Sequence, residues 1–195
     1  MNTLPTDEVG KILLKCCYAK EEAQIEGGFA GVFGTIAQTY FDRYGDQSDA
    51  LAMIAAKNHA NGALNPYAHM RRDLGYDFCR EPSAKNPFVA GPLKPTALVI
   101  SRDDHAPGRG QAITFRAAVQ VNDYLPLSRR DPTVFEGAAR AWQQALGTAN
   151  LSLADLSLVE THDCFTIAEL LEYEAMGLAE RGQGARVIAE GISRK

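Results

Sequence analysis

The chain of 195 residues lacks the long apolar runs that membrane proteins and secreted precursors need. No apolar run approaches the roughly twenty residues of a membrane-spanning helix. The N-terminus also lacks a basic region followed by an apolar one, which is the pattern of a secretory signal. We therefore expect no membrane span, and we predict a cytoplasmic location.

Clustered basic residues are also missing. Lysine and arginine together number 20 against 24 acidic residues, and the formal net charge is -4. Arg71-Arg72 and Arg129-Arg130 are only pairs, so no cluster is available to neutralise a run of phosphates. The composition therefore excludes a typical nucleic-acid-binding protein.

The cysteines follow neither a metal-binding nor a disulfide pattern. There are four of them, at positions 16, 17, 79 and 164, and reduced thiols fit an intracellular compartment. In NHANGALNPYAH, His59 and His69 have no acidic or cysteine neighbour that could complete a ligand set. We expect no metal site, and we expect Asn58 and His59 to fix the following loop by hydrogen bonds.

What the chain does contain is a set of apolar stripes at helical spacing. Hydrophobic residues make up 46% of the sequence, enough for one good core. One stripe begins after Thr6-Asp7, a second runs over 29–44 and closes at Gly45, and a third begins at Ser48-Asp49. The third predicted helix carries Lys57-Asn58-His59.

Over residues 60–96 this periodicity disappears, because glycine and proline interrupt it repeatedly. A stretch of this length without regular structure is typical of a binding loop or an assembly arm.

The second half of the chain predicts an α/β arrangement. Residues 97–100 are a short buried-strand candidate, and apolar residues alternate over 113–121. A helix is predicted from Asp131-Pro132 to Gly147, and residues 156–160 form another strand candidate before the next helix. This βαβα order implies parallel pairing. Further on, GQG at 182–184 lacks the full glycine fingerprint of a phosphate loop, so we predict a turn before a short final helix.

The most informative segment is HDCF, residues His162-Asp163-Cys164-Phe165, at the predicted strand-to-helix turn. Side chains at the carboxyl end of a strand project into the crevice where open α/β folds bind ligands. An imidazole, a carboxylate and a thiol in this place can hydrogen-bond, position water or exchange a proton. The alternative is a turn that carries polar residues by chance, since such turns are rich in them.

The wider string VETHDCFTIAELLEYEAMGLAERGQGARVIAEG resembles the C-terminal half of thiolases, in their sterol-carrier-protein-type, acetyl-CoA acetyltransferase-like branch. HDCF stands there in the place of the NEAF motif of other thiolases. KNHANGALNPYAHMRRD, followed by GPLKPT, resembles the loop domain of the same branch. The resemblance implies an αβαβα layered fold, with 1–96 as a loop-domain-like region. It implies that 97–195 hold the end of the N-terminal half and the start of the C-terminal half.

The resemblance also implies a function, that of a thiolase-type acyltransferase acting on acyl-CoA or 3-ketoacyl-CoA. The coenzyme A thioester is then a substrate, and no cofactor is tightly bound. His162 would help to bind a water or the thioester oxygen in an oxyanion hole, Asp163 would orient His162 or the turn, and Cys164 would line the pocket with Phe165 beneath it. These first three residues are the candidate catalytic residues, and a homodimer or homotetramer is expected.

The family's other motifs are missing. Neither GHP nor Cys-Gly occurs in the sequence, and Cys16, Cys17 and Cys79 do not sit in the motif of the family's nucleophile. We favour the interpretation that this chain is part of a longer enzyme over the alternative that it is a shortened relative. The prediction that it is an enzyme depends on this interpretation. Two alternatives stand beside it: a thiolase-like carbon-carbon lyase of the steroid side-chain aldolase type, and a non-catalytic acyl-CoA-binding or scaffold subunit with an OB-fold partner protein.

Overall fold

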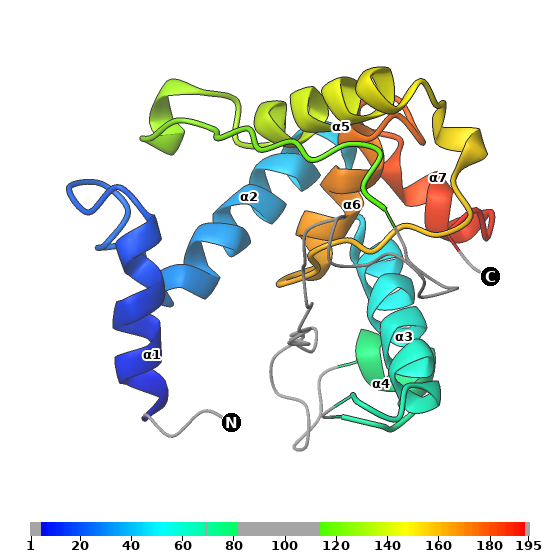
Figure 1. The fold of residues 1–195 in the computed structure, drawn as a ribbon. Coiled ribbons are helices and arrows are strands. Elements are labelled where there is room, and N and C mark those ends of the chain that lie inside the picture. Colours follow the sequence, from blue (N-terminus) through cyan, green and yellow to red (C-terminus); the bar gives the residue numbers. More distant parts are fainter. Residues whose placement is uncertain (1–4, 69, 82–113, 194–195) are drawn as a thin grey trace.

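The computed structural model describes residues 5–68, 70–81 and 114–193, and the regular structure in these ranges is helical (Figure 1). None of the described helices is long and apolar enough to cross a membrane. The elements in chain order are α1 (Thr6–Leu13), the short 3-10 helix η1 (Leu14–Cys16), α2 (Gly28–Tyr44), α3 (Ser48–Leu64), α4 (Gly75–Arg80), η3 (Leu127–Arg129), α5 (Glu136–Ala149), η4 (Leu153–Asp155), α6 (Thr166–Ala175) and α7 (Gly184–Ala189).

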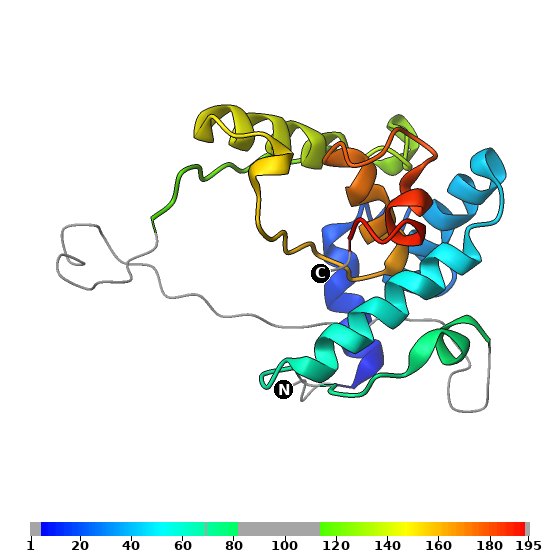
Figure 2. The ribbon, with the colours of Figure 1, turned by 90° about the vertical axis from the view of Figure 1, so that its right-hand side faces the viewer.

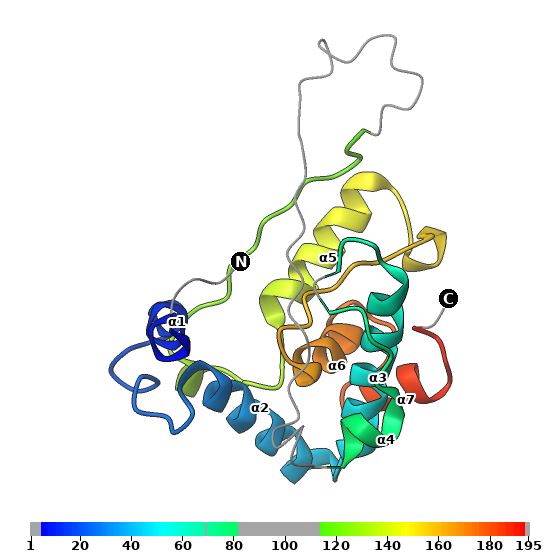
Figure 3. The same ribbon diagram turned by 90° about the horizontal axis from the view of Figure 1, so that it is seen from below.

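Helix α6 is the centre of the molecule. It contacts α2, α3, α5 and α7, and Figures 1 and 3 show it between them. Every residue from Thr166 to Leu171 is buried, and Leu170 has no exposed surface. HDCF directly precedes this helix, so the motif is attached to the most buried element of the fold.

The three helices predicted in the first third of the chain are confirmed. α2 ends at Tyr44 because Gly45 adopts a left-handed φ of 85° there, and α3 begins at Ser48. α1 begins at Thr6 as expected, and it contacts α2. Its apolar stripe remains partly uncovered, however, since Ile12 is 49% and Leu13 38% exposed.

The prediction of irregular structure over 60–96 is wrong in its described part. α3 continues to Leu64, and the short helix α4 packs beside α3 (Figure 2). The physical reason is a tertiary contact: Cys79 of α4 buries itself against the small side chains of Ala52 and Ala55 on α3. A six-residue helix is stabilised by such packing and not by local propensity. Residues 82–96 lie outside the described residues.

The predicted strands are not seen in the described residues. The candidate at 97–100 and Ile113 lie outside them, while 114–121 and 156–160 are described and carry no strand. Ala117, Val119 and Val121 are half-buried between exposed neighbours, so the predicted alternation of faces is present. A strand also needs a neighbouring backbone to pair with, and no described segment pairs with either of these two. The layered α/β prediction is therefore not confirmed by the fold.

The predicted bounds of α5 are corrected at both ends. The helix begins at Glu136, and the carboxylate of Asp123 caps it from a distance by accepting the Gly137 N–H at 2.9 Å. At the other end it continues past Gly147 to Ala149, where Asn150 takes a left-handed φ of 54°. Asp131 does not cap the helix because its side chain is engaged elsewhere.

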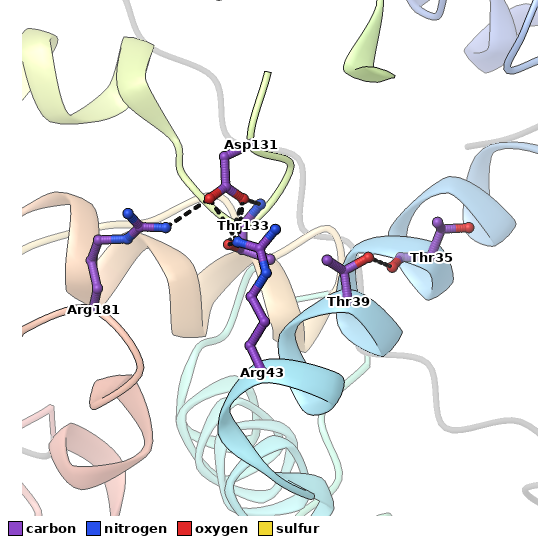
Figure 4. A network of polar contacts seen from close by, with 6 residues as sticks. All are labelled: Thr35, Thr39, Arg43, Asp131, Thr133 and Arg181. Carbon is purple, nitrogen blue, oxygen red and sulfur yellow. Dashed lines mark hydrogen bonds and ion pairs between the residues drawn. The ribbon is translucent and has the colours of Figure 1, made fainter. Parts of the chain in front are cut away.

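Asp131 joins three parts of the chain (Figure 4). Its carboxylate lies 2.6 Å from Arg43 of α2 and 2.8 Å from Arg181 of the turn before α7. It also accepts the hydroxyl and the backbone N–H of Thr133, at 2.7 and 3.0 Å. Burial alone would raise the pKa of the Asp131 carboxyl, but the hydrogen bonds from Thr133, Arg43 and Arg181 outweigh it and hold the pKa well below its ordinary value.

We expect Asp131→Asn to destabilise the protein at pH 7 by roughly 1–2 kcal/mol, because hydrogen bonds to charged groups contribute about 1.5–3 kcal/mol and solvent screens this partly exposed pair. Because the folded pKa is depressed, the stabilisation is fully present above the unfolded pKa of about 4 and is lost as the pH falls through the lower folded value. Urea unfolding at pH 7 and pH 3 should therefore show a difference between wild type and variant that shrinks at pH 3. Asp42→Asn, an exposed carboxylate that accepts only a glutamine in the same helix, is the control. An Asp131→Asn effect that is equal at both pH values would contradict the assignment.

Candidate functional site

The HDCF turn lies at the start of α6 with its residues unequally buried. His162 is exposed, whereas Asp163, Cys164 and Phe165 are half-buried. Phe165 stacks on Phe33 of α2, with ring centroids 4.6 Å apart and an interplanar angle of 26°. An aromatic stack therefore fixes the turn on its α2 side, and the imidazole is left on the surface.

A second set of contacts comes from α3, more than a hundred residues earlier in the chain. The side-chain amide of Asn58 donates to Asp163 Oδ2 at 2.5 Å and to Glu169 Oε2 at 2.6 Å. Lys57 forms an ion pair with Glu169 Oε1 and donates to the Tyr173 hydroxyl at 3.1 Å. These residues, Lys57, Asn58, Asp163, Glu169 and Tyr173, are called the Glu169 cluster below.

Glu169 is an anchor in this cluster. Its side chain is only 2% exposed, and it accepts donors from Lys57, Asn58 and Tyr173. Burial and the neighbouring Glu169 charge raise the pKa of the Tyr173 phenol, so this phenol is neutral and acts as a donor. Three side chains therefore fix the position of this buried carboxylate.

Glu172 lies on the same helix behind the motif. Burial, followed by the charges of Glu169 and Asp163, raises the pKa of Glu172 to about 7. Hydrogen bonds from the His162 backbone N–H and the Thr161 hydroxyl act in the opposite direction. The raised pKa of Glu172 thus places a carboxyl group that titrates near neutral pH close to the charge of Asp163.

The Cys164 thiol is a poor nucleophile in this setting. Burial raises its pKa first, and the charges of Glu172 and Asp163 add to the effect. The thiolate is the reactive form of cysteine, so a raised pKa leaves little of it at neutral pH. This fits the interpretation of Cys164 as a lining residue. Among the other cysteines, Cys16 is exposed, Cys17 is half-buried and Cys79 is buried.

A mostly apolar cavity of about 280 Å³ lies between α2, the start of α5 and the segment before it. Phe33 lines it, and Phe33 also stacks on Phe165. No HDCF residue lines this cavity, so the prediction that Cys164 lines a pocket stays a prediction.

The predicted turn at GQG is confirmed, and its backbone donors are occupied. The N–H groups of Gly182 and Gly184 donate to Glu174 Oε1 at 3.1 and 2.9 Å, and the Tyr40 hydroxyl donates to the same oxygen. A phosphate would need these same donors. A carboxylate from within the chain therefore takes the place that a bound anion would have.

Histidine contributes no metal cluster in the described ranges. They contain no group of three or more His, Cys, Asp or Glu side chains that could hold a metal ion. His59 is buried on α3, and His69 lies outside the described residues. The described hydrogen bonds of Asn58 go to the HDCF turn and α6, and the expectation that Asn58 and His59 fix the following loop stays a prediction.

Sequence reasoning missed Lys57, Glu169 and Glu172. A signal was available, because Glu169 interrupts the apolar run from Ile167 to Leu171. A charged residue on a buried stripe requires a partner of opposite charge. The partner could not be named, since nothing local connects α6 to α3.

Comparison with known proteins shows similarity to thiolases. Residues 118–195 match the family model described as thiolase C-terminal domain-like. Acetyl-CoA acetyltransferase of Methanothermobacter thermautotrophicus is 29% identical over 185 residues, covering 89% of this chain and 47% of that protein. Benzoylsuccinyl-CoA thiolase subunit BbsB of Thauera aromatica is 29% identical over 173 residues, covering 83% of this chain and 44% of the relative. Human sterol carrier protein 2 is 26% identical over 203 residues, covering 97% of this chain and 36% of that protein.

The chain therefore spans between about a third and a half of the length of these relatives. The matched family region contains HDCF, α5, α6 and α7, and the relatives extend the similarity toward the N-terminus. The thiolase resemblance predicted from HDCF is confirmed, because residues 118–195 match the thiolase C-terminal domain-like family model and the relatives include thiolases.

Proposed function

We propose that this chain is part of a thiolase-type acyltransferase that acts on acyl-CoA or 3-ketoacyl-CoA thioesters. The observation that carries the proposal is the HDCF turn itself, in which exposed His162 lies on a turn whose neighbouring side chains are held by Phe33 and Asn58. The names of two relatives, an acetyl-CoA acetyltransferase and a benzoylsuccinyl-CoA thiolase subunit, support a coenzyme A thioester as the substrate. No tightly bound cofactor is part of the proposal.

The proposed chemistry requires a donor at the thioester oxygen. When a carbon-carbon bond next to a thioester forms or breaks, negative charge develops on the carbonyl oxygen. A preorganised donor there lowers the barrier by a few kcal/mol, roughly 3–4 for one oxyanion-hole donor. His162 takes this role, directly or through a water, while Asp163 orients the turn and Cys164 lines the pocket.

The layered α/β fold belongs to the same proposal. The alternate burial of Ala117, Val119 and Val121 supports a strand at this position in the assembled protein. A homodimer or homotetramer is proposed on the family resemblance.

We expect His162→Ala, made in the complete protein that contains this chain, to lower thioester turnover at least about tenfold. Its stability should change by less than about 0.5 kcal/mol, because the side chain is exposed. Steady-state thiolysis and condensation assays, with urea unfolding alongside, provide the measurement. Glu160→Ala, an exposed residue of the same segment, is the matched control and should keep full activity. An unchanged rate in His162→Ala, or a loss of folding, would favour a polar turn without catalytic function.

Two other functions stand beside the proposed acyltransferase. One is a carbon-carbon lyase of the steroid side-chain aldolase type. A non-catalytic acyl-CoA-binding subunit with an OB-fold partner is the other. Acyl-CoA binding by calorimetry beside the turnover assay separates them, because a scaffold subunit would bind the thioester without converting it.

A further inference from the structure

We propose that Asn58 is a positioning residue for the HDCF turn, and that Asp163 acts as its hydrogen-bond anchor and not as an acid or base. The inference deepens the proposed function and rests on it where catalysis is concerned. It assigns to α3 the task of holding the motif in place.

The geometry of the Asn58 amide carries the argument. Its nitrogen has two N–H groups, and it approaches Asp163 Oδ2 at 2.5 Å and Glu169 Oε2 at 2.6 Å. Two carboxylates so close to one nitrogen would repel each other without a donor between them. A neutral double donor is therefore the side chain that this position needs.

The hydrogen bonds from Asn58 are well anchored because one of their two acceptors, Glu169, is buried. Glu169 of α6 forms an ion pair with Lys57, which lies next to Asn58 on α3. The side-chain exposures are 10% for Lys57 and 2% for Glu169. Successive residues of α3 thus fix one carboxylate of α6 and, through Asn58, one carboxylate of the motif. The position of the turn therefore depends on the packing of α3 against α6.

The turn is held from its other side as well. Phe165, two residues after Asp163, stacks on Phe33 of α2 with ring centroids 4.6 Å apart, so the turn has a second fixed partner. A site residue must be held within about 0.5 Å of its productive position to act efficiently. Asn58 supplies this through Asp163 without touching the reacting atoms itself.

Kinetics of two substitutions test the assignment in the complete protein. Asn58→Ala should lower kcat about tenfold with KM little changed, because the donor of the exposed imidazole becomes misplaced. Asp163→Ala should lower kcat by a similar factor of about ten, and the double variant Asn58→Ala/Asp163→Ala should lose little more than either single variant, because both changes remove the same hydrogen bond. Asn61→Ala, an exposed asparagine one turn further along α3, is the matched control. An Asp163→Ala loss about a hundredfold larger than that of Asn58→Ala, or independent losses that multiply in the double variant, would overturn the proposal, because Asp163 would then act on its own and not through Asn58.

Cysteine labelling gives a readout that does not depend on turnover. Pulse alkylation with iodoacetamide, read for each cysteine by mass spectrometry, should show Asn58→Ala increasing the labelling of Cys164 at least about fivefold. Buried Cys79 packs on α3 and reports loosening of that helix, and exposed Cys16 reports the reagent. Increased labelling of Cys164 with unchanged labelling of Cys79 supports the proposal. An equal increase at Cys79, or no increase at Cys164, overturns it. A wild-type protein without thioester turnover would overturn the proposed function alone, and the labelling would still decide the anchoring.

Discussion

Replacing Lys57 with methionine is expected to lower the free energy of unfolding by about 3–5 kcal/mol at pH 7, the cost of breaking a buried ion pair. Glu169 is 2% exposed, so its charge would lose its cationic partner without gaining water. Asn58 and Tyr173 would still donate to it, but neither carries a compensating charge. The whole interface between α3 and α6 should loosen as a result.

Urea unfolding of a double-mutant cycle measures this effect. Glu169→Gln combined with Lys57→Met should cost less than the sum of the single changes, because neither charge is then left unpaired. Arg186→Met is the matched control, since Arg186 pairs with Glu190 at 2.9 Å on the surface, with side-chain exposures of 64% and 49%. We expect this control to cost less than about 1 kcal/mol. A similarly small cost for Lys57→Met would mean that Glu169 finds water or a proton in the folded protein.

The helices were predictable where the signal is local. The aromatic stripe of α2, closed by Gly45, and the start of α3 at Ser48 depend on residues three or four apart in sequence. α4 was missed because its stability comes from Cys79 packing on α3, which is a tertiary contact. The segment 114–121 shows the expected alternation, yet strand formation depends on a partner that the alternation does not supply.

Of the two parts of the site, the HDCF turn was predictable from the sequence and the contribution of α3 was not. HDCF was found from its residue types and its place before an apolar helical stripe, and this turn lies where expected. Lys57 and Asn58 belong to a helix more than a hundred residues away, and their side chains gave no local signal. The raised pKa of Glu172 likewise depends on burial and on the charges of Glu169 and Asp163, which only the folded arrangement brings together.

Substitutions in the turn before α7 give the second large expected loss of stability, because there is no room for a side chain at Gly182 or Gly184. A Cβ on Gly184 would lie 2.7 Å from the Leu170 carbonyl oxygen and 2.9 Å from Glu174 Oε1. A Cβ on Gly182 would overlap the ring of Tyr44, and the φ of 78° at Gly182 is unfavourable for other residues. Each substitution by alanine should therefore cost about 3 kcal/mol, from overpacking and from the lost hydrogen bond to Glu174.

Two other glycines separate crowding from backbone strain in the same urea or thermal unfolding experiment. Gly177 has a φ of 88°, and no atom lies within 4 Å of the place that an added Cβ would take, so Gly177→Ala should cost only the strain of roughly 1–2 kcal/mol. Gly34 lies inside α2 with open space around it, and Gly34→Ala should stabilise the protein by about 0.5–1 kcal/mol. If Gly184→Ala proved as mild as Gly177→Ala, Glu174 would not hold the turn closely. The two N–H groups would then be free to bind an anion, and the interpretation of GQG as a closed turn would be wrong.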